Sequence, residues 1–217
     1  MYHYFYLTER NPRLNTAQFI DRWRRHAVIA AAIPEFWTPV RRYLQNDVLP
    51  DGLPGVPGVS TGFDALGEFF FDSTEVKVDA PPHLAQDMVE IAGPGGRRPF
   101  GGVREVLSGT AEGPYRVTRI ATRAEGVSVP ALAEALRAGA AGLDGIGVAV
   151  SSSTQPTFPF DGVVTVWVAD LDAAAKLLNS PAWHGLGERT AGVSDPAKEL
   201  TLVAREVLLK VGPAEAP

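Results

Sequence analysis

The sequence predicts an α+β protein made of two tandem copies of one small unit that pack sheet to sheet within a single chain. Three short strings recur in the same order, about one hundred residues apart. The matching pairs are Arg104–Leu107 with Arg205–Leu208, Phe63-Asp64 with Phe160-Asp161 and, more loosely, Asp79–His83 with Asn179–Trp183. A single match of this kind is a coincidence of a few letters, but three in register indicate an internal duplication.

The first half contains the elements of the unit in order. Aromatic and apolar residues predict a strand at Tyr2–Leu7, and Asn15 or Thr16 can cap a helix that continues to Ile33, before Pro34. The remaining predicted elements are strands at Val40–Val48, Phe63–Phe71 and Val103–Leu107, a Gly/Pro-rich loop at 50–62, a helical region from Ser73 that bends or restarts at Pro81-Pro82, and a turn at Gly93–Gly96. This order, β-α-β-β-α-β, is that of the ferredoxin-like fold.

The second half has the same predicted order of strands and helices. Its predicted strands are Tyr115–Thr122, Ile146–Ser151, Val163–Val168 and Leu200–Leu209, and its predicted helices are Val129–Ala141 and Leu171–Leu178, with a further turn after Pro181. Pro130 suits the first turn of its helix. We therefore expect one unit over residues 1–108 and a second over residues 109–217.

The two units are expected to cover each other. Helices shield only one face of a ferredoxin-like sheet, and the other face, rich in β-branched and aromatic residues, needs a partner. The linker at 108–114 is short. An intrachain pseudo-dimer that closes as a barrel therefore fits better than two independent domains.

Composition excludes several classes of function. The formal net charge is −5 and basic residues form only short pairs, so no nucleic-acid footprint is present. The absence of cysteine excludes disulfides, thiolate nucleophiles and zinc–thiolate sites, and fits a cytoplasmic protein. No apolar run is long enough to span a membrane, and the first residues do not resemble a signal peptide.

No motif for a bound metal or nucleotide cofactor is present. The sequence has no HExxH, and Arg97-Arg98 after the Gly93–Gly96 segment replaces the Lys-Ser/Thr pair of a phosphate loop. We therefore expect no cofactor, although a single histidine can ligate haem.

One stretch of the first half resembles a known family. Arg10–Leu14 leads into Phe19, Trp23, Arg24 and His26-Ala27, and then into Arg42–Asn46. This pattern is similar to the EthD group of the dimeric α/β-barrel superfamily. The resemblance implies a modest apolar cavity between sheet and helices, in proteins that include muconolactone isomerases, polyketide cyclases and dehydratases, cofactor-independent monooxygenases and some haem enzymes. The second half fits the fold without the motif, so one site per chain is expected.

His26 is the first catalytic candidate. It borders the apolar stripe of its predicted helix, three residues after Trp23, where an imidazole can take and return a proton near neutral pH. Tyr43 is the second, because a phenol can hold a carbonyl or enolate oxygen. In lactone isomerases of the resembled group, a histidine and a tyrosine at comparable motif positions are linked to the site. Each has a structural alternative, a packed helix histidine and a core tyrosine with a satisfied hydroxyl.

Glu68 is the third catalytic candidate. It interrupts an apolar strand and shares a face with Leu66 and Phe70. It could orient His26 or accept a proton, or it could simply pair with an arginine such as Arg42. The candidate substrate-binding residues, mostly aromatic, are Tyr4, Tyr6, Trp23, Trp37, Phe70 and His83. His3 is expected to be exposed, and His184 is given no role.

The leading hypothesis is a cofactor-independent enzyme that acts on a small hydrophobic cyclic or aromatic substrate of the polyketide or lactone type. It would be a cyclase, dehydratase or isomerase with His26 as acid and base. One alternative is a cofactor-free monooxygenase, and another is a non-enzymatic binder of a hydrophobic metabolite or haem. The expected partners are the ring substrate and, beyond the intrachain pseudo-dimer, a second barrel, with no nucleic acid and no membrane.

Overall fold

The computed structural model describes residues 1–74 and 81–211. Within them, eight strands close a single antiparallel barrel in the order β1-β3-β2-β8-β5-β7-β6-β4. The strands are β1 (Tyr2–Arg10), β2 (Arg42–Val48), β3 (Ala65–Phe71), β4 (Ala92–Gly109), β5 (Tyr115–Ala121), β6 (Gly147–Ser153), β7 (Gly162–Val168) and β8 (Leu200–Val211). The predicted α+β class and the barrel are confirmed.

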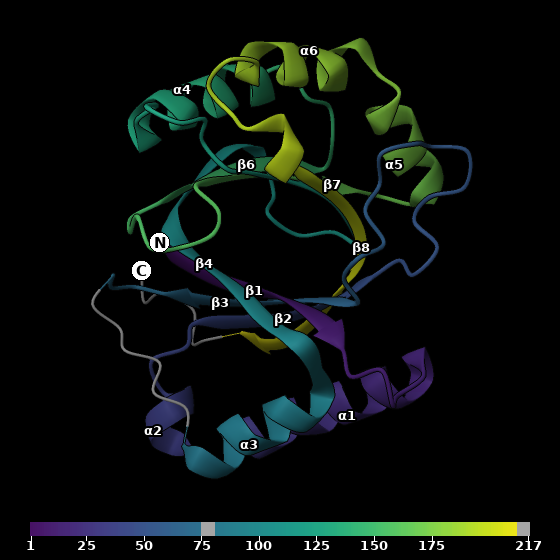
Figure 1. Ribbon diagram of the computed structural model, residues 1–217, viewed down its shortest axis with the longest axis vertical. Coiled ribbons are helices and arrows are strands. Elements are labelled where there is room, and N and C mark those ends of the chain that lie inside the picture. The colour runs from purple at the N-terminus through teal and green to yellow at the C-terminus, as the bar shows by residue number, and fades with distance from the viewer. Residues whose placement is uncertain (75–80, 212–217) are drawn as a thin grey trace.

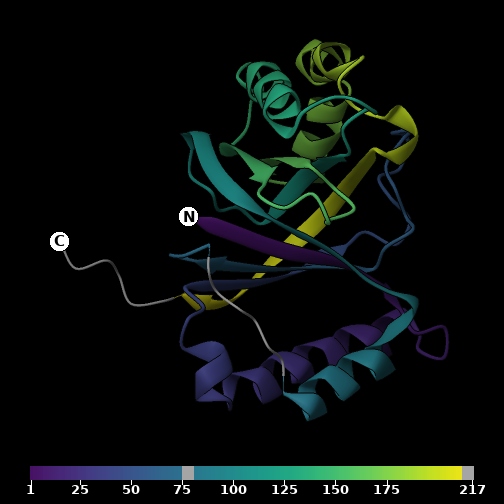
Figure 2. The ribbon, with the colours of Figure 1, turned by 60° about the vertical axis from the view of Figure 1, so that its left-hand side comes forward.

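The helices cover two opposite sides of this barrel (Figures 1 and 2). On one side lie α1 (Thr16–Ala31), α2 (Pro34–Trp37) and α3 (Pro82–Ile91), and on the other α4 (Val129–Ala140), α5 (Leu171–Leu178) and α6 (Pro181–Thr190), followed by a 3-10 turn at Pro196–Lys198. The predicted cap of α1 is present, because the Gln18 amide donates to the Asn15 side chain at 2.9 Å and the Gln18 side chain accepts from the Asn15 amide. No described helix is long and apolar enough to cross a membrane.

The two halves of the chain join edge to edge. Strand β2 pairs with β8, and β4 pairs with β6, so hydrogen bonds cross both seams of the barrel. The long loop from the first half also reaches across, since the Leu49 amide donates to Val203 O and the Ser60 amide to Thr201 O. The halves are therefore not independent domains.

Two local predictions are corrected. The segment Gly93–Gly96 is not a turn between elements but the start of β4, where the register with β1 shifts between Thr8 and Arg10. Gly96 takes the left-handed conformation that such an irregularity needs, with φ of 63°. The short helix α2 was not predicted. The predicted helical start at Ser73 and part of the repeated string at Asp79–His83 fall on residues 75–80, which lie outside the described residues.

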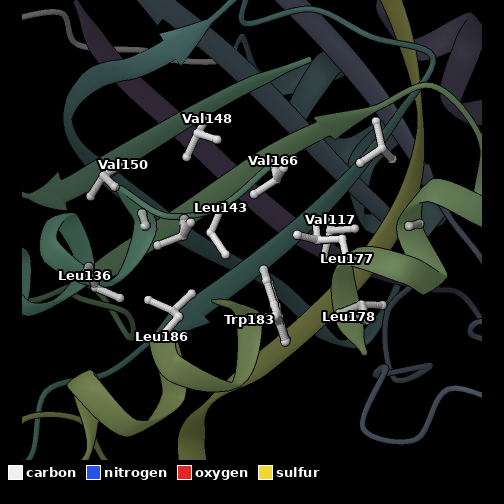
Figure 3. Packing of buried hydrophobic residues seen from close by; sticks show 14 of the residues in the cluster. Val117, Leu136, Leu143, Val148, Val150, Val166, Leu177, Leu178, Trp183 and Leu186 are labelled. Atoms are coloured by element: carbon white, nitrogen blue, oxygen red, sulfur yellow. The ribbon is translucent and has the colours of Figure 1, made fainter. Parts of the chain in front are cut away.

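Alternation along the strands divides the side chains among three regions. The first layer lies between the sheet β1-β3-β2 and α1 and α3, and its buried cluster includes Tyr2, Tyr6, Phe19, Trp23, Tyr43, Phe69, Phe71 and Met88. The second layer lies under α4–α6 and is aliphatic apart from Trp183 (Figure 3). The barrel interior is lined from both halves, by residues that include Phe5, Leu66, Phe100, Ile120 and Leu202.

Candidate functional site

The first layer is bordered by a histidine–carboxylate pair in which the histidine is buried and the carboxylate is partly exposed. His26 projects from α1, is only 6% exposed, and its Nδ1 lies 2.7 Å from Oδ2 of Asp87 on α3. Arg22 lies 3.5 Å from the other Asp87 oxygen. Burial lowers the pKa of His26 below 6.5, although the hydrogen bond that His26 makes to Asp87 works in the opposite direction. His26 is therefore neutral near pH 7, and with Nδ1–H donated to Asp87 its Nε2 carries a free lone pair.

The hydroxyl of Tyr43 is already engaged. It accepts a hydrogen bond from Gln45 Nε2 at 3.0 Å and is hydrogen-bonded to the hydroxyl of Tyr6. Burial, followed by the neighbouring Tyr6, raises the pKa of Tyr43 well above 10, so the phenol stays protonated. Its ring stacks on Phe69 at 4.4 Å and meets the edge of Trp37 at 5.3 Å.

The candidate substrate-binding residues of the first half other than Phe70 lie either in the first layer or at the surface. Tyr4, Tyr6, Trp23 and Trp37 all belong to or pack against the cluster of the first layer. The indole Nε1 of Trp23 is buried without a hydrogen-bond partner among the described residues, and Arg97 lies 5.2 Å over the Tyr6 ring. Burial also raises the pKa of Tyr4. His83, in contrast, is exposed at the start of α3.

A groove of about 700 Å³ opens at the edge of the first layer. Its lining includes Asn11, Arg13, Met88, Ala92 and Arg97. Met88 and Ala92 also belong to the buried aromatic cluster, so the groove adjoins the first layer. Neither His26 nor Tyr43 lines this groove.

Comparison with known families identifies this region. Residues 11–89 match the sequence profile of the EthD domain. This match covers most of the first half of the chain, which is called the EthD domain below because of that similarity. The matched span contains both His26 and Asp87, and it also contains Tyr43. No curated protein sequence matches the chain.

Solved structures share the fold over nearly the whole chain. They include an anthrone oxidase-like protein (TM-score 0.62, 12% identity, 99% of this chain and 94% of that one). A proposed monooxygenase from Fusobacterium nucleatum has a TM-score of 0.62 at 8% identity, covering 97% and 94%. A proposed monooxygenase from Lactobacillus acidophilus has a TM-score of 0.54 at 15% identity, covering 97% and 96%. At these identities the similarity establishes the dimeric α/β-barrel fold and no more.

Glu68 does not orient His26, so that hypothesis is wrong, whereas the alternative that it pairs with an arginine is confirmed. Strand alternation points Glu68 into the barrel interior, away from α1, where it is 1% exposed. There it accepts from Asn46 Nδ2 at 2.8 Å, lies 2.8 Å from His3 Nε2 and pairs with Arg116 of β5. Asp87 takes the role that the sequence suggested for Glu68. The arginine partner is Arg116 rather than Arg42, which instead binds Glu206 at 3.2 Å.

Phe70 and His3 also face the interior, behind the sheet of the EthD domain. Their rings stack at 4.7 Å, so Phe70 is not a wall of the first layer. The expectation that His3 is exposed is wrong, because it is 2% exposed and its Nδ1 lies 2.9 Å from Ser151 Oγ. Burial, together with the charges of Arg104 and Arg116, lowers the pKa of His3 well below 6.5.

Asp87 is the partner of His26 that sequence reasoning missed. One signal could have found it. On α3 it lies three residues after Leu84 and beside Met88, so a carboxylate borders the buried stripe of α3 as His26 borders that of α1. Among the described residues, no group of three or more His, Asp or Glu side chains could hold a metal ion.

Proposed function

We propose that the EthD domain is the catalytic half of a cofactor-independent enzyme that moves a proton on a small hydrophobic cyclic or aromatic substrate. The reaction would be a cyclisation, dehydration or isomerisation of a polyketide or lactone type of compound. The observation that carries this proposal is the pairing of buried His26 with the partly exposed Asp87 at the edge of an aromatic layer.

The chemistry follows from the protonation states of the pair. A neutral His26 can remove a proton through Nε2, and Asp87 fixes the tautomer and stabilises the imidazolium that forms. The same imidazolium can return the proton to another atom of the substrate. The aromatic walls exclude water, and we propose that the hydroxyl pair of Tyr43 and Tyr6 holds a substrate oxygen.

The test is turnover of His26→Gln against a panel of aromatic and lactone substrates. We expect kcat/KM to fall by about 10²- to 10⁴-fold, while the thermal midpoint moves little. His184→Gln is the matched control, since His184 is an exposed helix histidine in the second half. A His26→Gln protein with full activity would remove the mechanism.

Asp87→Asn tests the pairing itself. Asp87 raises the pKa of His26 against the effect of burial, so its removal lowers that pKa further. Because the base must be neutral, the acid limb of the kcat/KM profile should move to lower pH in Asp87→Asn, with a reduced plateau. An unshifted acid limb would show that Asp87 does not act on the catalytic base.

A cofactor-free monooxygenase is the second candidate, and the similarity to the anthrone oxidase-like and monooxygenase structures favours it. The same base would deprotonate an electron-rich phenol or anthrone, which then reacts with oxygen. An oxygen electrode separates the two reactions, because only the monooxygenase consumes oxygen with substrate. Ligand binding without turnover, or a Soret band in the purified protein, would favour a binder of a metabolite or haem.

We also propose that residues 1–108 and 109–217 are two ferredoxin-like units. Each half has the order β-α-β-β-α-β, with α2 and the split α5–α6 as local additions. The strand orders β4-β1-β3-β2 and β8-β5-β7-β6 correspond position by position, which supports a duplication. On this view the second unit completes the barrel without a site of its own.

A further inference from the structure

The barrel interior contains an arginine cluster that the proposed reaction does not use. It consists of Arg42 on β2, Arg104 on β4 and Arg116 on β5. Arg116 is 1% exposed and lies in the same interior as Glu68. Arg42 and Arg104 are partly exposed, so the cluster reaches the mouth of the barrel.

The buried charges of this cluster do not balance. The cluster has two buried carboxylates as partners. Glu68 pairs with Arg116, and Glu206 pairs with Arg42. The Glu206 carboxylate also lies 3.7 Å from Arg116. Arg104 makes no ion pair among the described residues. Its guanidinium lies 4.8 Å from the ring centre of Phe70 and 4.7 Å from that of Trp167.

Neighbouring titratable groups do not neutralise the excess positive charge of the arginine cluster. Burial lowers the pKa of Arg104 and of Arg116 to about 10, so both remain charged at neutral pH, while His3 is neutral. Glu112 lies 3.2 Å from Arg42, but it is 68% exposed and water screens its charge. One positive charge is therefore left without a buried counter-charge.

Several guanidinium N–H groups in the cluster are also unused. Nε of Arg42, Nη2 of Arg104, and both Nε and Nη2 of Arg116 are buried without a hydrogen-bond partner among the described residues. Burying a charged donor without a partner is costly, and a guanidinium presents its donors in a rigid fork that suits a carboxylate or a small anion.

We propose that the arginine cluster binds one monovalent anion of the size of chloride or formate. A single charge matches the buried excess, and the unpaired N–H groups supply the donors. Because Arg42 and Arg104 come from the first half and Arg116 from the second, the bound anion also links the two halves. This site is separate from the first layer, since the sheet lies between them.

The test uses the full-length protein at constant ionic strength, with chloride or formate replacing a bulky organic anion. The thermal midpoint should rise by about 3–6 °C for each tenfold increase in chloride above its Kd. The excess ³⁵Cl relaxation that the protein causes should saturate with concentration, and formate should displace it. Arg104→Gln should lose both effects, whereas Arg137→Gln, which removes an exposed charge of α4, should keep them.

Three outcomes would overturn the proposal. The first is a midpoint that follows ionic strength alone, with no saturable ³⁵Cl relaxation in the wild-type protein. The second is an Arg104→Gln protein that retains both effects. The third is loss of both effects in Arg97→Gln but not in Arg104→Gln, which would place the anion in the groove beside α3. If Arg104→Gln does not fold, displacement of chloride by formate in the wild-type protein decides whether a saturable site exists.

Discussion

The first and second layers have corresponding topologies but opposite contents. Under α1 and α3, the sheet presents tyrosines, phenylalanines and the polar side chain of Gln45, and α1 adds His26. Under α4 to α6, the buried cluster consists of valine, leucine and alanine, with Trp183 as its aromatic member (Figure 3). Leu53, from the long loop of the first half, adds to this second cluster.

The difference suggests separate roles for the two layers. The second layer is mainly aliphatic, and its titratable groups include an ion pair between Arg119 and Glu199 beside α6 but no histidine in the buried cluster. The aromatic layer has a buried imidazole, phenols and an unpaired indole N–H, which are the groups that a ring substrate with polar substituents needs. The proposed function places the chemistry in the first layer, while the second layer contributes to stability through aliphatic burial.

The largest effect on stability is expected in the interior that both halves share. Glu68→Gln leaves Arg116 with a buried charge and only the more distant Glu206, so the free energy of unfolding should fall by about 3–5 kcal/mol. Glu105→Gln on β4 breaks only an exposed pair with Arg137 and should cost less than about 1 kcal/mol. Denaturant titration measures both, and equal losses would show that the interior pair does not hold the halves together.

The next largest effect lies in the second layer. Leu136→Ala on α4 removes a fully buried side chain and should lower the free energy of unfolding by about 2–5 kcal/mol. The kcat/KM measured well below the thermal midpoint should stay unchanged. Val89→Ala, at an exposed position on α3, is the control and should have little effect on stability. A large loss of kcat/KM in folded Leu136→Ala would contradict the claim that the second layer takes no part in the chemistry.

Stability should also fall at acidic pH. Burial and two arginines lower the pKa of His3 in the folded protein, so the unfolded chain takes up this proton first as the pH falls through 6.5. The contribution of neutral His3 is fully present above pH 6.5 and is lost below it, by about 1.4 kcal/mol per pH unit. His26 acts in the same direction.

His3→Gln isolates this contribution. Denaturant midpoints between pH 5 and pH 7 should depend less on pH in His3→Gln than in the wild-type protein. His184→Gln, which changes an exposed histidine, should retain the wild-type dependence. An unchanged slope in His3→Gln would show that His3 takes up its proton equally in both states.

The smallest stability effect concerns the hydroxyl of Tyr43. Tyr43→Phe removes a hydrogen bond from Gln45, whose amide still donates to Trp23 O, so the cost should be about 0.5–1.5 kcal/mol. Since this hydroxyl is engaged with Gln45 and Tyr6, kcat/KM should fall less than in His26→Gln. A loss as large as that of His26→Gln would move the chemistry from the imidazole to the phenol.

Most of the fold could be predicted from local signals. The reciprocal cap of Asn15 and Gln18, the prolines in the first turns of α4 and α6 and the alternating strands each specify an element without knowledge of the rest. The start of β4 could not, because the run Gly93–Gly96 is typical of a turn, and only the pairing of the flanking Ala92 and Arg97 with β1 places it within a strand.

The local sequence also could not predict which residues of the two matching strings point into the barrel. The strings Arg104–Leu107 and Arg205–Leu208 have the same letters but opposite phase. Arg104 and Glu206 point into the barrel, while Glu105 and Arg205 are largely exposed. Register shifts in the β4–β6 and β2–β8 pairs accompany this difference, and such irregularities depend on the partner strand.

Of the two paired residues of the candidate site, only His26 could be predicted from the local sequence. His26 borders an apolar stripe that can be recognised from helical spacing alone. Its partner Asp87 follows 61 residues later on another helix, so only the packing of α1 against α3 brings them together.

The most direct test of the account is a crystal structure with a small phenolic or lactone ligand bound. The account predicts that the ligand occupies the first layer, with a polar atom within hydrogen-bond distance of His26 Nε2 and with Asp87 still on Nδ1. A ligand seated under α4 to α6, or in the first layer without contact to His26, would contradict the assignment of chemistry to the aromatic half.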